Sequence, residues 1–385
     1  MRDHLQDSAW CEISLAQISQ NLRHTLTRLP PKTRLCAVIK ADAYGHGIEN
    51  VVPALMAQGV SHIGICSNSE ARAVRDAGFA GSLLRLRTAT PQEVEGALCD
   101  RVEELIGSVE GLLAIQARLG ARVLPPLHLS LNAGGMSREG VELSTRQGRA
   151  DCARILELGT GHIVGLCTHF PSNNSDELAD NIARFHQDLA WVFANSALRR
   201  EEVLTHAGST LTLVSGQDPE VDMMRCGAIL FGIAAAGPEF HPAMRLKSRV
   251  INLGTYPEGS TIGYDRTCVL RHDRLLASVA LGYANGYSRK MSKGAKVLIR
   301  GQSCPVMGAI SMNTIVADVT DVSGVTIGDE VVAFGRQGQR EIGSAAIERY
   351  SGTILADLFS DWGQRNPRLV KGAEDLISAQ VAELP

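Results

Sequence analysis

The chain has 385 residues, a length that fits two domains better than one. Hydrophobic residues make up 44% and charged residues 21%, and the net charge of -3 comes without blocks of one sign. These values allow a sizeable core and exclude the electrostatic footprint of a nucleic-acid or membrane-surface protein, so we expect a protein that acts on a small molecule.

The N-terminus and the cysteines indicate the expected cellular compartment. The first ten residues, MRDHLQDSAW, carry no apolar stretch like that of a signal peptide, and no run has the length of a transmembrane helix. The nine cysteines are scattered and never form a C-x-x-C pair, which favours reduced, mostly buried thiols over disulfides or a zinc site. We expect a cytoplasmic protein without a metal, or a periplasmic one if this chain is a mature form.

Short apolar runs recur along the first part of the chain, and most gaps between them are helix-like. Examples of such gaps are Ser69–Ala77, Pro91–Leu98 and Glu177–Leu198. Alternating strands and helices predict crossover units and a parallel sheet, and eight units in about 200 residues match a small TIM barrel. The expected strands are Leu35–Lys40, His62–Ser67, Leu83–Thr88, Glu104–Gly107, Leu127–Asn132, Ile163–Phe170, Val203–Gly208 and Met224–Gly232.

The pattern changes after residue 243, where strand-like runs alternate with turns rich in glycine and proline. The runs include MRLKSRVINLG, RLLASVALGY, KVLIR and IVADV, and Ser344–Tyr350 and Ile354–Phe359 look like short helices. We therefore expect an α/β chain: a (β/α)8 barrel at 11–243 and a β-rich domain at 244–385, with residues 1–10 packing on the second domain.

The densest motif is AVIKADAYGHG at positions 37–47, in which Lys40 ends an apolar strand and a glycine-rich turn follows. Barrel enzymes place their active sites at the carboxyl ends of the strands. An isolated lysine at such a position is more often solvated, but Tyr44 follows within one turn and can reach the same mouth. A lysine held there among apolar neighbours has a lowered pKa, which suits covalent bonding to a carbonyl group.

This motif and several others resemble the alanine racemase family, whose matching lysine holds pyridoxal 5′-phosphate (PLP). The resemblance runs from Trp10 to about Pro367, with the motifs in the family's order. It implies a homodimer in which each active site takes residues from both chains. It also implies an amino-acid racemase that interconverts L- and D-isomers with two catalytic bases, Lys40 and Tyr264.

The resemblance extends to residues around the cofactor. His169, in the triplet THF, matches a histidine beside the cofactor ring, and Arg138, in GGMSR, matches an arginine near the phenolic oxygen and the substrate. Arg225 matches an arginine that faces the pyridine nitrogen. Because a guanidinium cannot accept the ring proton, this contact favours return of a proton to the α-carbon over transamination. The expected cofactor-binding residues are Lys40, Tyr44, Arg138, His169, Ser209, Arg225, Gly227 and Ala228, of which Ser209, Gly227 and Ala228 lie in the usual barrel phosphate region.

Tyr264, in the segment TIGYD of the second domain, resembles the family's catalytic tyrosine. Racemisation requires a base on each face of a planar carbanion, and a phenol with a depressed pKa can serve opposite an amine. We expect His169 and Arg225 to be the cationic neighbours that lower this pKa. The resemblance also places Tyr283 and the backbone N–H of Met312 near the substrate carboxylate.

Other positions depart from ordinary alanine racemases. The lysine that is carbamylated in those enzymes, where it supports the arginine, is absent from HLSLNAGG at 128–135, and Ala356 stands where a tyrosine narrows the pocket. These changes resemble the broad-specificity amino-acid racemase branch, as do Arg85, Arg87 and Asn132. We expect alanine, serine and basic amino acids as substrates.

Three positions fit that branch less well. Glu139 stands where an asparagine is expected, and Phe359 stands where a tyrosine is expected. Gly208 replaces the asparagine that usually precedes the phosphate-binding serine. Because a carboxylate near the mouth attracts an ammonium or guanidinium group, Glu139 favours basic substrates.

Three other functions remain open. A strict alanine racemase would share the cofactor residues. A fold-related basic amino-acid decarboxylase needs a cysteine–aspartate pair in the β-rich domain and a glycine-rich phosphate loop, neither of which is evident in the sequence. A non-catalytic PLP carrier is a lone barrel, whereas this chain continues into a second domain that carries Tyr264.

Overall fold

In the computed structural model of the protein, residues 7–171, 174–234 and 236–372 are described. The chain divides into two compact units. The barrel unit consists of Ser19–Ala43 and Ile48–Phe240. The sheet unit consists of the residues up to Ile18, the short segment Tyr44–Gly47 and the residues from His241 onward. Among the described residues, none of the helices is long and apolar enough to cross a lipid bilayer.

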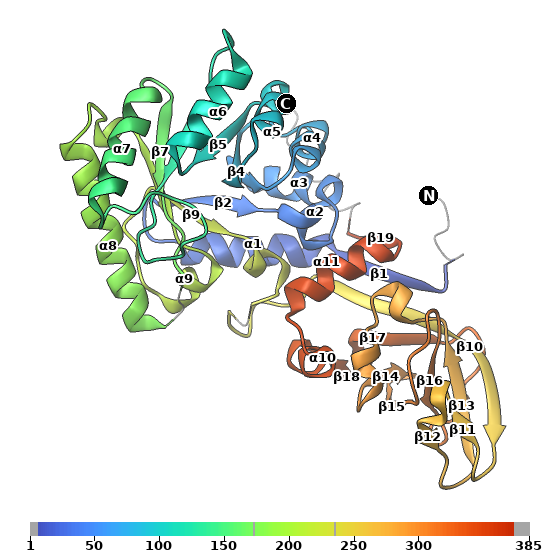
Figure 1. Cartoon of the computed structure of the whole chain (residues 1–385). Coiled ribbons are helices and arrows are strands. Elements are labelled where there is room, and N and C mark those ends of the chain that lie inside the picture. The colour runs from blue at the N-terminus through green and yellow to red at the C-terminus, as the bar shows by residue number, and fades with distance from the viewer. Residues whose placement is uncertain (1–6, 172–173, 235, 373–385) are drawn as a thin grey trace, which may run out of the picture. The chain divides into compact units, whose positions relative to one another are not determined.

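Eight parallel strands form a closed barrel (Figure 1), with β9 pairing to β2 so that Cys36 lies beside Arg225. The strands are short and mostly buried, as expected of parallel strands covered on both faces. Each of the eight predicted apolar runs overlaps one of them, so the predicted barrel is confirmed. They are β2 Arg34–Val38, β3 His62–Ile65, β4 Ser82–Thr88, β5 Val102–Ile106, β6 Leu127–Ser130, β7 Ile163–Cys167, β8 Leu204–Ala207 and β9 Met223–Cys226.

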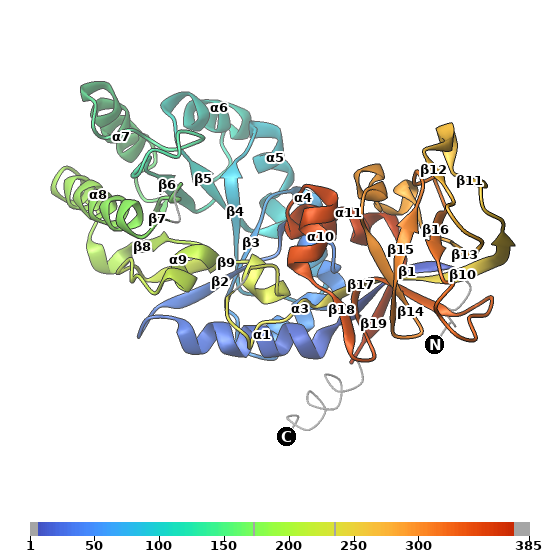
Figure 2. The same cartoon turned by 90° about the horizontal axis from the view of Figure 1, so that it is seen from below.

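Helices connect these strands, and Figure 2 shows α4 to α8 around the outside of the barrel. Several begin with a side-chain cap: Ser67 and Thr90 form capping boxes with Glu70 and Glu93, three residues further on. The helix after β8 has only six residues. The helices are α1 Leu15–Arg28, α3 Ile48–Met56, α4 Asn68–Asp76, α5 Pro91–Gly96, α6 Val109–Leu119, α7 Arg146–Leu158, α8 Ser175–Ala194 and α9 Thr210–Ser215.

The sheet unit contains a nine-stranded sheet in the order β18-β17-β14-β15-β16-β13-β10-β1-β19. The first strand of the chain, β1, belongs to this sheet and not to the barrel, since Ala9 pairs with Ser248 of β10. The strands are β1 Ala9–Ser14, β10 Met244–Tyr256, β13 Arg274–Val279, β14 Lys296–Ile299, β15 Gln302–Met307, β16 Ile315–Asp318, β17 Glu330–Gln337, β18 Arg340–Ile342 and β19 Arg368–Lys371; β11 Thr261–Ile262 and β12 Cys268–Val269 form a separate pair.

Two helices, α10 Ser344–Ser351 and α11 Leu355–Arg365, complete the sheet unit. Phe359 and Trp362 of α11 are fully buried, and their ring centroids lie 5.5 Å from that of Phe334 on β17. Such aromatic clusters combine a large buried area with favourable ring geometry. Because Phe359 is enclosed by other rings, a phenylalanine there needs no hydrogen-bond partner, which accounts for this departure from the expected tyrosine.

Candidate active site

Lys40 lies two residues after the end of β2, at the carboxyl end of the barrel, as predicted. Its side chain is exposed and not enclosed by apolar neighbours as expected. The next four residues, Ala41–Tyr44 of α2 (Lys40–Tyr44), all have left-handed backbone angles, with φ between 52° and 55°. Since such a conformation costs about 1–2 kcal/mol per residue, other contacts must hold the turn. One of these is the hydrogen bond from the backbone N–H of Ile48 to the Asp42 carboxylate at 2.8 Å.

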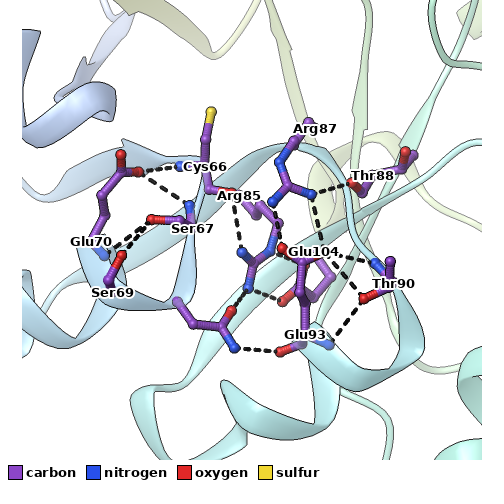
Figure 3. Close-up of polar contacts among 11 residues, drawn as sticks. Cys66, Ser67, Ser69, Glu70, Arg85, Arg87, Thr88, Thr90, Glu93 and Glu104 are labelled. Atoms are coloured by element: carbon purple, nitrogen blue, oxygen red, sulfur yellow. Dashed lines mark hydrogen bonds and ion pairs between the residues drawn. The ribbon is translucent and has the colours of Figure 1, made fainter. Parts of the chain in front are cut away.

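A second carboxylate, that of Glu70 on α4, holds the start of the same turn. Its Oε1 accepts the backbone N–H of Ala41 at 2.7 Å, and its Oε2 accepts those of Cys66 and Ser67 at 2.7 and 3.1 Å. Figure 3 shows Glu70 reaching across to the end of β3. Sequence reasoning missed this residue, although the capping-box spacing of Ser67 and Glu70 just after a strand was the available signal.

Four predicted cofactor residues come together at the mouth of the barrel. Burial, followed by the positive charges of Arg225, Arg138 and Lys40, lowers the pKa of His169 to about 4. His169 is therefore neutral at pH 7, and the expectation that it contributes positive charge is wrong. The three remaining cations make this mouth a place for an anionic group.

Arg225 is nearly buried, and neutral acceptors hold it. Its Nη1 donates to His206 Nδ1 at 2.6 Å and to the His206 carbonyl at 2.9 Å, and its Nη2 donates to the Thr168 carbonyl at 2.5 Å. No carboxylate among the described residues forms an ion pair with it. Because a guanidinium does not release its proton, Arg225 presents an uncompensated positive charge to the mouth.

Arg138 lies in the loop after β6, where its own neighbour binds it. Nη2 and Nε donate to Glu139 Oε1 at 2.5 and 3.1 Å. The amide oxygen of Asn132 shapes the same loop by accepting the backbone N–H of Ser137 at 2.8 Å. The Glu139 carboxylate is thus already paired with a cation, which weakens the argument that it attracts basic substrates.

The two arginines of β4 noted in the sequence lie in the barrel wall (Figure 3). Arg85 is fully buried and binds both oxygens of Glu104, at 2.8 and 3.1 Å, and the Asn68 amide oxygen at 2.7 Å. Arg87 pairs with Glu93 of the α5 capping box at 2.5 Å. The buried pair of Arg85 and Glu104 adds little net stability, but removal of one partner leaves the other charge buried and destabilises the fold strongly. Both arginines are thus held in the barrel wall by carboxylates.

The predicted phosphate-binding residues follow adjacent strands. Ser209 follows β8, while Gly227 and Ala228 follow β9, which pairs with β8. Gly208 has a φ of +76°, in the left-handed region that glycine adopts freely and asparagine tolerates best among the other residues. The replacement of the usual asparagine by Gly208 therefore keeps the backbone shape before the serine.

Two predicted substrate residues lie together in the sheet unit. The backbone N–H of Tyr283 donates to the Ser311 carbonyl at 3.1 Å, and that of Ala284 donates to the Met312 carbonyl at 2.9 Å. A Cβ on Gly282 would lie 2.3 Å from the Met312 oxygen, so only glycine permits this approach. No acceptor among the described residues binds the Met312 N–H, which is therefore available for a carboxylate.

The loop of Tyr264 packs nearby in the same unit. Tyr264 follows Gly263, where a Cβ would lie 2.9 Å from the backbone nitrogen of Ala309, and the chain continues from Ala309 to Met312. The side chains of Tyr264, Tyr283 and Met312 are 64%, 36% and 54% exposed. An exposed group of large apolar side chains is typical of a surface that binds a ligand or another chain.

These features define an enzyme with a barrel unit, whose mouth is suited to an anionic small molecule, and a separate sheet unit. Comparison with known proteins identifies the family. Residues 13–235 match the model of the alanine racemase N-terminal domain and residues 243–370 that of the alanine racemase C-terminal domain. The chain belongs to the alanine racemase family, which confirms the resemblance seen in its motifs.

Curated relatives match over nearly the whole chain. A broad specificity amino-acid racemase of Aeromonas hydrophila is 42% identical over 369 residues, which is 94% of this chain and 90% of the relative. A lysine racemase of Proteus mirabilis is 37% identical over 366 residues, with the same coverage of 94% and 90%.

Solved structures share the fold. An alanine racemase of Bacillus anthracis with bound L-Ala-P superposes with a TM-score of 0.86, at 23% identity and 95% coverage of both chains. An alanine racemase of Bartonella henselae with covalently bound pyridoxal phosphate gives a TM-score of 0.82, at 21% identity and coverage of 94% and 99%.

Proposed function

We propose that this protein is a PLP-dependent amino-acid racemase of broad specificity. The observation that carries the proposal is Arg225, a buried guanidinium held by neutral acceptors at the mouth that also contains Lys40. A carboxylate in that place would share a proton with a pyridine nitrogen, whereas a guanidinium can only donate to it. A guanidinium at this position favours return of a proton to the α-carbon, and hence racemisation over transamination.

The residues at the barrel mouth fit PLP. Lys40 offers an exposed amine for the cofactor aldehyde, and Arg138 offers a guanidinium for the phenolic oxygen. Ser209, Gly227 and Ala228 offer a hydroxyl and backbone N–H groups to the phosphate, and Tyr44 and the neutral ring of His169 complete the set. When bound, PLP supplies an electron sink that makes the α-proton of an amino acid acidic.

We assign the two bases to Lys40 and Tyr264. Interconversion of enantiomers requires proton removal on one face of the α-carbon and proton return on the other, which one side chain cannot do equally well. Tyr283 and the Met312 N–H would orient the substrate carboxylate near the phenol. The exposure of Tyr264 in a single chain supports a homodimer in which a second copy covers this surface.

Broad specificity rests on the size of the pocket. Ala356, half-buried in the first turn of α11, lacks the phenol ring that the narrower enzymes place there. The named relatives include racemases of broad specificity and a lysine racemase, and alanine, serine and basic amino acids are the substrates to expect. Since Glu139 is paired with Arg138, the size of the pocket is the better reason for long side chains.

We place the enzyme in the cytoplasm. Six of its nine cysteines are buried, and burial raises the pKa of Cys36 and Cys226 to about 12, which keeps these thiols protonated and unreactive. Such thiols suit a reducing compartment.

The test is incubation of the purified enzyme, loaded with PLP, with single L-amino acids. Optical rotation that falls toward zero without release of carbon dioxide indicates a racemase. Release of carbon dioxide would indicate a decarboxylase. No change in either quantity would indicate a non-catalytic PLP carrier. A panel that includes alanine, serine, methionine, lysine and arginine distinguishes broad specificity from a strict alanine racemase.

A further inference from the structure

A line of four side chains crosses the interior of the barrel from Arg225 to Glu103. Arg225 Nη1 lies 2.6 Å from His206 Nδ1, His206 Nε2 lies 2.9 Å from His128 Nδ1, and His128 Nε2 lies 2.8 Å from Glu103 Oε2. Both histidine side chains are fully buried. Arg225 is near the carboxyl end of β9 and Glu103 is near the amino end of β5, so the line connects the two ends of the barrel.

The chemistry of arginine fixes the direction of every hydrogen bond in this line. Arg225 can only donate, so His206 Nδ1 must accept and its proton must be on Nε2. His206 Nε2 therefore donates to His128 Nδ1, which leaves the His128 proton on Nε2, facing the Glu103 carboxylate. Each ring carries one proton and is neutral. In agreement, burial, followed by the charge of Arg225, holds the pKa of His206 well below its ordinary value.

Residues of the barrel wall make room for the His128 ring and hold the Glu103 carboxylate. A Cβ on Gly165 of β7 would lie 1.9 Å from His128 Nδ1, so only glycine leaves room for the ring to reach His206. At the far end, burial opposes ionisation of Glu103, but hydrogen bonds from His128 and Ser82 hold its pKa below the ordinary value. Glu103 also lines a cavity of about 520 Å³ at the amino end of the strands.

We propose that Glu103 and His128 are positioning residues for Arg225, acting through His206. The ionised carboxylate is the final acceptor that orients both rings, so that an unprotonated nitrogen always faces the guanidinium. Two neutral rings separate the two charges, which leaves the positive charge of Arg225 available at the mouth. Because Arg225 does not release its proton, the line orients groups and moves no proton. The effect on the reaction rests on the proposed function, whereas the protonation states do not.

The first test reads the protonation states directly, in enzyme without cofactor. Ring nitrogen NMR at pH 7 on protein labelled in histidine, with assignment through His128→Asn and His206→Asn, should show Nδ1 unprotonated and Nε2 protonated in both rings. In Glu103→Gln the His128 Nε2 proton should shift upfield, because its acceptor loses the charge. A ring protonated on both nitrogens, or on Nδ1, would overturn the proposal. This result is independent of whether the enzyme is a racemase.

The second test measures kinetics in the PLP-loaded enzyme. Glu103→Gln keeps a hydrogen-bond acceptor but removes the negative charge. We expect kcat to fall about tenfold with little change in KM, because a tenfold fall corresponds to the contribution of one charge-assisted hydrogen bond. Gly165→Ala, which displaces the His128 ring, should reduce kcat in the same way. Glu110→Gln, an exposed carboxylate in the first turn of α6, is the control. A folded Glu103→Gln enzyme with the kcat of this control would refute the positioning role.

Discussion

Glu70 accepts the backbone N–H of Ala41, the residue directly after Lys40, at 2.7 Å. The same carboxylate binds two N–H groups at the end of β3, so it joins the ends of two neighbouring strands at the barrel mouth. Charge-assisted hydrogen bonds of this kind are about twice as strong as neutral ones. The left-handed turn that carries Lys40 is therefore held by a residue of α4, the helix that follows β3.

Removal of this carboxylate should loosen Lys40. In Glu70→Ala we expect the affinity for PLP to fall by about tenfold or more, since hydrogen bonds to a charged group contribute about 1.5–3 kcal/mol each. The measurement is a titration of the apo-enzyme with PLP, followed by absorbance. Ser108→Ala, which removes the side-chain cap of α6 and does not affect the Lys40 turn, is the control. Equal losses of affinity in both variants would show that only helix capping is affected.

Lys40 itself can be tested as the residue that binds the cofactor covalently. Lys40→Ala should lose the visible absorbance of the bound cofactor and keep its far-ultraviolet circular dichroism and thermal midpoint close to those of the wild type, because the side chain is exposed. Borohydride reduction followed by peptide mapping identifies the modified lysine in the wild type. A reduced lysine adduct in the active site of the variant would show that another lysine has this role.

Tyr264 should act on one face of the substrate only. In Tyr264→Phe we expect exchange of the α-proton with solvent deuterium to fall far more for one enantiomer than for the other, because Lys40 still serves its own face. Proton NMR of the two enantiomers in deuterium oxide measures both rates. Equal losses would argue for a single base.

The proposed sharing of each active site between two chains gives a second test of the same variant. A mixed dimer of Lys40→Ala and Tyr264→Phe chains contains one site with both defects and one intact site, if each site takes one base from each chain. Mixing the two inactive proteins should therefore restore activity. If labelled chains exchange and activity does not return, the two bases come from one chain.

The sequence predicts well what depends on local pattern. The eight barrel strands could be predicted because each is a short apolar run, and the position of Lys40 at the mouth could be predicted because it closely follows one of them. The sequence does not predict the contacts that depend on side-chain reach between distant strands. Glu103 and His206 are about a hundred residues apart and meet only through His128, and the pairing of Arg138 with Glu139 depends on the path of one loop.

Stability should respond to pH through His169. Its pKa is about 4 in the folded chain and about 6.5 when unfolded, so between these values the unfolded chain binds more protons and stability rises with pH. In His169→Gln the free energy of unfolding should rise less steeply from pH 4 to 6.5, measured by urea denaturation. Burial raises the pKa of Asp188 to about 6, so the contribution of Asp188 to stability falls as pH rises. Asp188→Asn should therefore make the increase of the unfolding free energy with pH steeper. Identical slopes in the wild type and His169→Gln would contradict the neutral state of the ring.

The last prediction concerns the size of the substrate pocket, which Ala356 should set. Absence of a whole phenol ring leaves room for several methylene groups, and each methylene contributes about 1–3 kcal/mol to discrimination in an apolar pocket. We expect the wild type to racemise methionine, lysine and arginine with kcat/KM within a few powers of ten of that for alanine. Ala356→Tyr should reduce these three values strongly and leave alanine almost unchanged, because only long side chains meet the added ring. Ala356→Ser, which changes polarity with little change in volume, is the matched control. If Ala356→Tyr weakens all four substrates alike, the ring disturbs the cofactor and Ala356 does not select the substrate.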